Sequence, residues 1–218
     1  MEMESNGVNR LQGASSIFIW KGEGSQTLAS KTGSLQRTLE GLGGAQNSRF
    51  RGYIDFKKKR ENIGISGEGT IQQLGIPASN KLYFCSLSDL PDQIFIVSDN
   101  GSVVELSPEA EELARKANLY SSRVRMEIKG QFFECGDFTV HIFSCMMGST
   151  LKNIAIEVGY GPFLRIGDGM SMIRQFMEGI EEADNFQPIP QYSDDALNQT
   201  FSLKERISQY QALFSKLL

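Results

Sequence analysis

The chain has 218 residues, of which 40% are hydrophobic and 22% are charged, an ordinary composition for a globular protein. Its formal net charge of −4 argues against a general nucleic-acid binder, because such proteins usually carry a basic surface. No run of about 18 apolar residues occurs, so the sequence predicts no transmembrane helix.

Cysteines are few and odd in number. Cys85, Cys135 and Cys145 cannot form a disulfide framework, which indicates a reducing compartment. Residues 1–14 are polar and lack the apolar stretch of a signal peptide, so we expect a disordered tail on a soluble, intracellular chain. The glycosylation sequon at 198–200 is then expected to be incidental.

Strand and helix patterns alternate through the first 81 residues. Residues 16–20 (SIFIW) are apolar β-formers and predict a strand covered on both faces. A helix follows, with Leu28, Leu35, Leu39 and Leu42 at helical spacing and glycines at 41, 43 and 44 to end it. Residues 48–57 alternate as a strand, and the Gly-, Ser- and Asn-rich residues 61–81 predict a long loop.

Residues 82–117 predict three strands and a helix. Strands are expected at 82–86, 93–98 and 103–106, the last two joined by a tight turn at Asp99-Asn100-Gly101. Ser107-Pro108-Glu109 has the hydroxyl cap, early proline and acid that begin a helix. Its expected buried stripe is Ala110, Leu113, Ala114 and Ala117.

Residues 123–164 carry the clearest strand pattern. Three runs alternate with period two, which places each set on one strand face: Val124, Met126 and Ile128; Phe138, Val140 and Ile142; Ile154, Ile156, Val158 and Tyr160. Glycines at 130, 136, 148 and 161, with Pro162, punctuate the runs as turns. We therefore predict an antiparallel meander.

Two helices and a linker are predicted after the meander. Asp168 can cap a helix whose buried residues are Ile173, Phe176, Met177 and Ile180. Residues 184–193 contain two prolines and predict a linker. Residues 194–218 predict a terminal helix, packed on its own domain or on a partner, with the seam Leu203, Ile207, Tyr210, Phe214 and Leu217. The order of elements predicts an α+β domain over 15–183 with a mostly antiparallel sheet.

His141 is the only histidine and hence the only imidazole base. Cys135, His141 and Cys145 share parity, but His141 and Cys145 would lie roughly 13 Å apart on one strand. Zinc needs its ligands within about 2.3 Å. We therefore predict no metal site and a plain structural or surface histidine. No glycine-rich stretch has the lysine and hydroxyl of a P-loop, so no catalytic or cofactor-binding residue is predicted.

Residues 57–60 (KKKR) form a compact basic run close to Arg49 and Arg51. The run could be a nuclear-import signal or a contact for an anionic partner. An equally simple interpretation is solvated charge that discourages strand addition at a sheet edge.

One stretch approaches an enzyme pattern. Arg123, Arg125, Glu127 and Lys129 would share one strand face, and Glu157 could join them from another strand. The stretch resembles the ExExK signature of triphosphate-tunnel enzymes, whose barrels hold metal and triphosphate. Arg125 occupies the first acidic position, which removes a metal ligand. We keep a triphosphate-binding or phosphohydrolase barrel as the alternative and favour a charged face turned to solvent or a partner.

A block of residues resembles the family of Mediator of RNA polymerase II transcription subunit 20. The block comprises Cys135-Gly136-Asp137-Phe138, Val140, Met147-Gly148 and residues 156–162 (IEVGYGP), followed by the helix with Ile173 and Ile180. The resemblance implies an α+β domain closed into a β-barrel-like sheet with flanking helices. It transfers no catalytic residue.

The resemblance also implies a function. A member of this family is a non-enzymatic, nuclear subunit of the Mediator head module that forms a heterodimer with subunit 18. Subunit 8 then tethers the pair to the rest of the head. Further contacts with the TATA-binding protein and RNA polymerase II are implied, and neither a membrane nor sequence-specific nucleic acid is an expected partner.

Overall fold

The computed structural model describes residues 13–22, 25–60, 69, 73–180, 183–189 and 192–218. The elements in chain order are β1 (Ala14–Trp20), α1 (Ser25–Gly41), β2 (Ala45–Lys59), β3 (Lys81–Leu87), β4 (Ile94–Ser98), β5 (Val103–Leu106), α3 (Pro108–Lys116), β6 (Tyr120–Cys135), β7 (Phe138–Met147), β8 (Thr150–Tyr160), α4 (Ile166–Glu178), η1 (Ala183–Asn185), β9 (Phe186–Ile189), α5 (Asp194–Leu197) and α6 (Leu203–Leu217). Residues 1–12 of the predicted tail, and residues 61–68 and 70–72 of the predicted loop, lie outside these residues. Ala14 and Lys81, at the ends of the two predicted segments, begin β1 and β3.

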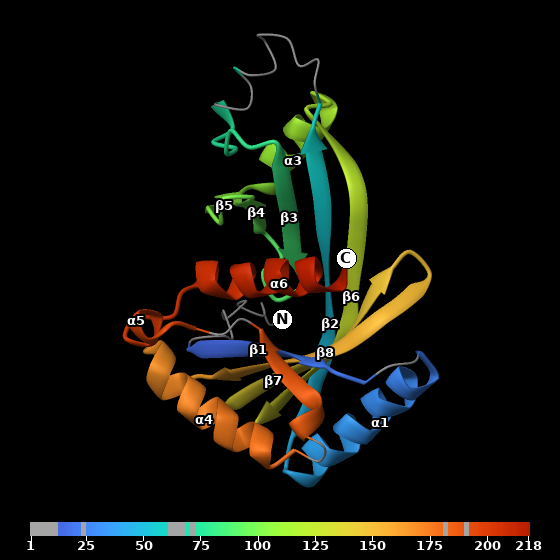
Figure 1. Ribbon diagram of the computed structural model, residues 1–218, viewed down its shortest axis with the longest axis vertical. Helices are drawn as coiled ribbons and strands as arrows, with labels where there is room; N and C mark the ends of the chain where they lie inside the picture. Colours follow the sequence, from blue (N-terminus) through green and yellow to red (C-terminus); the bar gives the residue numbers. More distant parts are fainter. Residues whose placement is uncertain (1–12, 23–24, 61–68, 70–72, 181–182, 190–191) are drawn as a thin grey trace, which may run out of the picture.

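The nine strands form one antiparallel sheet in the order β5-β4-β3-β2-β6-β7-β8-β1-β9 (Figure 1). The α+β class with a mostly antiparallel sheet is confirmed, but the predicted barrel is wrong. A barrel needs its two edge strands to pair, and in the described part of the chain β5 and β9 do not. Helix α6 buries the face that closure would have enclosed, so the sheet stays open.

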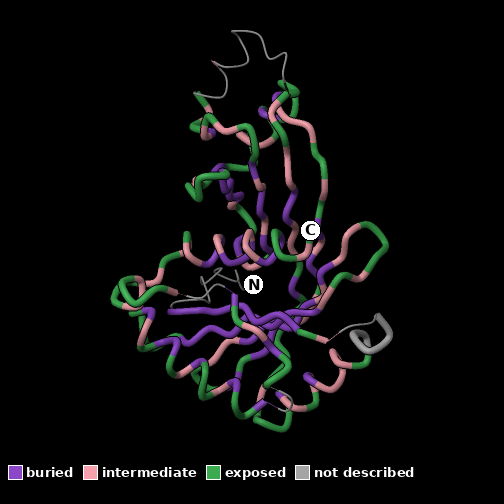
Figure 2. The backbone as a smooth tube through the Cα atoms, in the orientation of Figure 1, coloured by how far each residue is buried: buried purple, intermediate pink, exposed green. Residues whose placement is uncertain are grey.

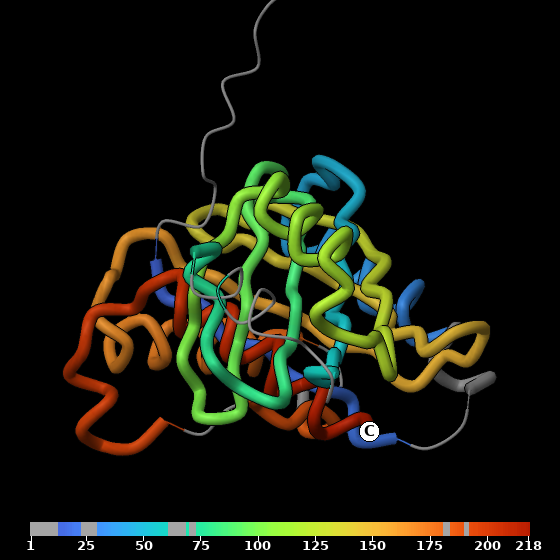
Figure 3. Tube along the Cα trace, turned by 90° about the horizontal axis from the view of Figure 1, so that it is seen from above, coloured from blue at the N-terminus to red at the C-terminus, as the bar shows by residue number. Residues whose placement is uncertain are grey.

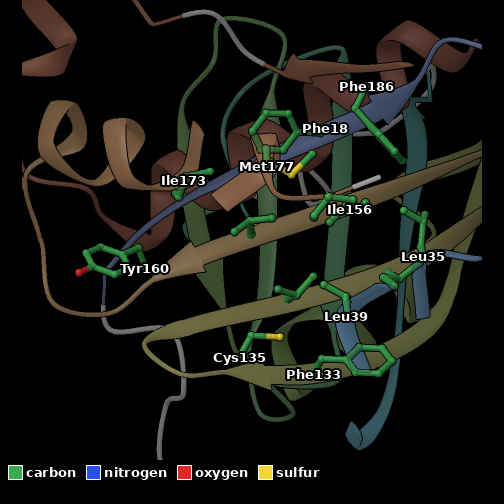
Figure 4. Packing of buried hydrophobic residues seen from close by; sticks show 14 of the residues in the cluster. Phe18, Leu35, Leu39, Phe133, Cys135, Ile156, Tyr160, Ile173, Met177 and Phe186 are labelled. Carbon is green, nitrogen blue, oxygen red and sulfur yellow. The ribbon is translucent and has the colours of Figure 1, made fainter. Parts of the chain in front are cut away.

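Helices α1 and α4 cover one face of the part of the sheet formed by β6, β7, β8, β1 and β9, which is the lower part in Figure 1. They lie at opposite sides of the molecule in Figure 1 and in the view from above (Figure 3). Leu35 and Leu39 of α1 and Ile173 and Met177 of α4 belong to one hydrophobic cluster with apolar side chains of the strands (Figure 4). The strands contribute Phe18, Phe133, Cys135, Val140, Ile142, Ile154, Ile156, Val158 and Tyr160.

The meander is confirmed as β6, β7 and β8. Residues Cys135 and Phe138 pair at the first turn and Met147 and Thr150 at the second. The turn glycines Gly136 and Gly148 have φ of +61° and +60°, a conformation that favours glycine. Both faces of the middle of β7 and β8 are buried, because α6 lies on the second face.

The part of the sheet formed by β3, β4 and β5, the upper part in Figure 1, has a small hydrophobic core of its own. Helix α3 closes it with Ala114, which packs against Phe84 and Leu106 of the strands. The predicted four-residue stripe of α3 is wrong, since Ala114 alone is buried and Leu113 is 52% exposed. Because α3 has only nine residues and lies at the end of the sheet, only a short stretch of the helix contacts the strands.

The segment after α4 differs from the prediction. The expected linker at 184–193 contains the edge strand β9, which pairs with β1 and tolerates its proline because an edge strand has one unpaired side. The expected helix at 194–218 is two helices. The second begins after Ser202, whose backbone N–H donates to Glu205 Oε2 at 2.8 Å in a capping box. No helix of the described residues is long and apolar enough to span a bilayer.

Candidate functional site

A cluster of charged and polar side chains is buried between α6 and the sheet. Its centre is Glu157 of β8, surrounded by His141 of β7 and by Arg206 and Tyr210 of α6. None of these four residues is more than 2% exposed. Buried charges of this kind survive only when they are paired and fully hydrogen-bonded.

The Glu157 carboxylate accepts hydrogen bonds at both oxygens. Arg206 donates a bidentate pair, from Nε to Oε1 at 2.7 Å and from Nη2 to Oε2 at 2.8 Å. The Tyr210 hydroxyl donates to Oε2 at 2.7 Å, and His141 Nδ1 donates to the same atom at 2.8 Å. Ser15 of β1 adds a hydroxyl bond to Oε1 at 3.2 Å. Five donors leave the carboxylate little capacity for another ligand.

Further contacts tie α6 to the rest of the sheet. Arg206 Nη1 lies 2.8 Å from Asp89 Oδ2, in the connection between β3 and β4. Gln209 bonds the backbone of β1 twice: its Nε2 donates to Ser15 O, and its Oε1 accepts from Ile17 N–H, both at 2.8 Å. One helix therefore holds three separate parts of the sheet.

The electrostatics of the cluster keep the ion pair charged. Burial would raise the pKa of Glu157, but the charge and hydrogen bonds of Arg206, with His141, hold that pKa well below its usual range. Burial and the Glu157 charge raise the pKa of the Tyr210 hydroxyl far above its ordinary value. Burial raises the pKa of the nearby Cys85 thiol to about 12.

This arrangement does not support catalysis. Ser15 and His141 both bond the carboxylate and not each other, so no nucleophile–base pair forms. The His141 ring stacks on Phe50 with centroids 4.2 Å apart and lies against Phe132 at 5.0 Å, which closes it off from solvent. The cluster fastens α6 to the sheet.

Glu157 does not join the charged residues of β6 as the sequence suggested. Register places it beside His141, and His141 beside Phe132, on the sheet face that also carries Met126 and Ile128. Glu127 and Lys129 alternate with those two residues and point to the opposite face. The expectation failed because odd and even residue numbers show which residues share a face within one strand only. To tell whether residues of two strands share a face, the register between the strands must be known.

The charged residues of β6 form a surface face. Lys129 Nζ pairs with Glu127 Oε2 at 2.6 Å, and the Arg125 guanidinium lies over the Tyr53 ring at 3.8 Å. Arg123 is exposed at an irregularity in the pairing with β2. With the sheet open and Glu157 on the other face, the geometry does not favour the triphosphate-binding alternative.

The remaining predicted residues are dispersed. Cys135 packs in the core under α1, whereas His141 and Cys145 lie on the other face. The described residues contain no group of three side chains able to hold a metal ion. In the basic run, Lys57 is 15% exposed, lies over the Phe84 ring at 3.8 Å and pairs with Asp55 and Glu111 at 3.8 and 3.6 Å.

Sequence reasoning missed Arg206 and Gln209. Both lie beside the apolar seam of α6, at positions where the helix faces the sheet. A long polar residue within such a seam is a signal for a buried partner. The sequence alone could not identify the buried partner of Arg206, because Arg206 and Glu157 are 49 residues apart in the chain.

Comparison with known proteins gives a consistent family. A sequence model described as "TATA-binding related factor (TRF) of subunit 20 of Mediator complex" matches residues 12–215. A Mediator subunit 20 from Anopheles gambiae is 29% identical over 128 residues, which are 55% of this chain and 57% of that protein. The Xenopus laevis subunit 20 is 25% identical over 191 residues, 84% of each chain.

Two similar solved structures have low TM-scores. A protein of Pyrococcus horikoshii has a TM-score of 0.46 and 11% identity, covering 84% of this chain and 99% of that one. A chain of the Schizosaccharomyces pombe Mediator head module has a TM-score of 0.37 and 9% identity, covering 93% and 91%. Both scores are below 0.5, so neither likeness carries an argument.

Proposed function

The chain belongs to the family of subunit 20 of the Mediator complex, and on that premise we propose that it is a non-enzymatic subunit of the Mediator head module that acts in the nucleus. The observation that carries the proposal is the family match over residues 12–215. That range includes the whole sheet and nearly all of α6, so it concerns the packed structure and not one short motif. The anticipated role is to help couple regulators to transcription initiation by RNA polymerase II.

The chemistry of the interior supports a non-enzymatic role. His141, the one histidine, and Glu157, whose carboxylate is fully buried, both take part in the hydrogen bonds that hold α6 on the sheet. Both are shielded from solvent, so neither can exchange protons with a substrate. On the face with Glu127 and Lys129 the acids are held in ion pairs, since Lys129 pairs with Glu127 and Lys57 pairs with Asp55 and Glu111. A triphosphate enzyme needs several acids free to bind a metal ion.

We further propose that the chain forms a heterodimer with Mediator subunit 18, and that subunit 8 links the pair to the other head subunits. The open edge at β5 supports such an assembly. Val103 and Val104 are only half-buried there, and no described strand pairs with the outer side of β5. An uncovered edge can accept a strand from a partner. Contacts with the TATA-binding protein and RNA polymerase II would then be made by the assembled head.

Co-expression tests the heterodimer. The chain and subunit 18 of the same organism are produced together with a tag on one of them, and the purified material is sized by light scattering. We expect a one-to-one complex that withstands 0.5 M salt. A subunit from another Mediator module, treated in the same way, serves as the control. Recovery of this chain as a stable monomer, with subunit 18 in the flow-through, would refute the heterodimer.

A further inference from the structure

Between α1 and α3, no described helix or strand covers one face of the paired strands β2 and β6 (Figure 1). At the lower end, Gln36 of α1 donates a hydrogen bond to the side chain of Gln131. At the upper end, the Tyr53 hydroxyl donates to Glu111 of α3 at 3.4 Å. Along this part of β6, exposed and intermediate residues alternate with Met126 and Ile128, which are buried on the other face (Figure 2). Within the described part of the chain, the surface between these two contacts is open sheet.

The uncovered face is basic. Arg49 and Arg51 of β2, with Arg125 and Lys129 of β6, lie on it and are all exposed; these four residues are the basic strip. Among described residues, Arg49 and Arg51 form no ion pair, and Lys129 pairs with Glu127. The same face carries the carboxylates of Glu127 and of Asp55, the ladder partner of Arg125, and the four cations outnumber them on a chain whose net charge is −4.

The register makes the basic strip costly for folding. Arg51 and Lys129 are direct partners in the β2–β6 ladder. Like charges directly opposite each other destabilise a sheet, and an opposite-charge pair at the same place would stabilise it. The arrangement is therefore better explained by a ligand that neutralises the strip than by a contribution to stability.

We propose that the basic strip binds an acidic, extended segment of a protein partner. Side chains on one strand face are about 7 Å apart along the strand, and an extended peptide presents every second side chain with the same spacing. The stretch from Arg49 to the level of Arg125 is about 20 Å long, the length of six extended residues. Alternating carboxylates can then meet the guanidinium groups in bidentate pairs.

A peptide fits this surface better than a nucleic acid does. Glu127 lies within the basic strip, and Asp55 and Glu111 border it. A continuous phosphate backbone would meet these carboxylates. A peptide can place an uncharged residue at those points, opposite Tyr53. Nucleic-acid binders commonly make 6–10 phosphate contacts, more than four cations supply.

The test measures fluorescence anisotropy of a labelled twelve-residue peptide of alternating Glu and Thr, added to the 218-residue chain at 50 mM salt. The double variant Arg51→Glu/Lys129→Glu is expected to bind at least about tenfold more weakly. The control is Lys58→Glu/Lys81→Glu. These two lysines are also direct ladder partners and exposed, and the change in net charge is the same. The control is expected to bind within about twofold of the unchanged chain.

The single variant Arg51→Glu separates binding from folding. It creates an opposite-charge pair with Lys129, so we expect the Tm to rise by about 1–3 °C while peptide affinity falls. Three results would overturn the proposal: no peptide binding by the unchanged chain, equal losses in both double variants, or tighter binding of a twelve-residue thymidine strand that Arg51→Glu/Lys129→Glu abolishes. The inference does not depend on membership of the Mediator head.

Discussion

Replacing Arg206 by methionine tests the role of the buried cluster most sharply. Methionine keeps much of the side-chain volume but removes the three nitrogens that contact Glu157 and Asp89. The Glu157 carboxylate then stays fully buried without its cation. We expect the free energy of unfolding at pH 7.5 to fall by about 3–5 kcal/mol, the usual cost of breaking a buried pair on one side. This is a large share of the roughly 5–15 kcal/mol that stabilises a typical domain.

The loss should depend on pH in a particular direction. In the unchanged chain the pKa of Glu157 is held below its usual range, so its stabilisation is complete above the unfolded pKa of about 4.3 and is lost as the pH falls toward the folded pKa. In Arg206→Met, burial raises the pKa of Glu157 and the folded state takes up a proton. The stability of the variant should therefore rise on acidification from pH 7.5 to 5, while that of the unchanged chain does not.

Urea unfolding followed by the fluorescence of Trp20, the only tryptophan and 6% exposed, supplies the measurement. Arg174→Met on the exposed side of α4 is the control and should change stability by less than about 0.5 kcal/mol. Tyr210→Phe, which removes one donor to Glu157, should cost about 1.5–3 kcal/mol. The reasoning would be refuted if Arg206→Met lowered the free energy of unfolding by less than about 1 kcal/mol. It would also be refuted if the difference in stability between the variant and the unchanged chain grew as the pH fell.

Two more predictions concern the core. A Cβ at Gly130 would lie 2.0 Å from Ile142 O, so Gly130→Ala should lose at least about 2 kcal/mol in urea unfolding; Gly33→Ala, in open space on α1, should gain about 0.5–1 kcal/mol. Equal effects of the two changes would contradict the packing. Burial raises the pKa of the Cys85 and Cys145 thiols to about 12, so neither should react with Ellman's reagent at pH 8 until urea unfolds the chain. Rapid reaction of more than one thiol per native chain would show that Cys85 or Cys145 is not buried, because Cys135 is the only other cysteine.

The strands β3, β4 and β5 could be predicted from short stretches of the sequence. The apolar runs at 82–86, 93–98 and 103–106 became β3, β4 and β5, and Gly101 has the expected positive φ of +82°. These elements are joined by short connections and pair with neighbours in the chain. Periodicity and turn chemistry contain the required information when contacts are so local.

Long-range pairing was not accessible in the same way. The strand β9 was missed because its proline suggests a linker, and only pairing with β1, some 170 residues earlier in the chain, makes it a strand. The open form of the sheet likewise depends on where α6 packs. The Glu157 cluster joins β1, β7, β8 and α6, so no sequence spacing could have assembled it.

Purification of the tagged chain from nuclei, with quantitative mass spectrometry of the proteins that accompany it, tests the proposed function most directly. The account predicts that subunit 18, subunit 8 and the other Mediator head subunits are enriched in near-equal amounts over an untagged control. Recovery of the chain at its own mass, with no Mediator subunit above the control, would contradict it.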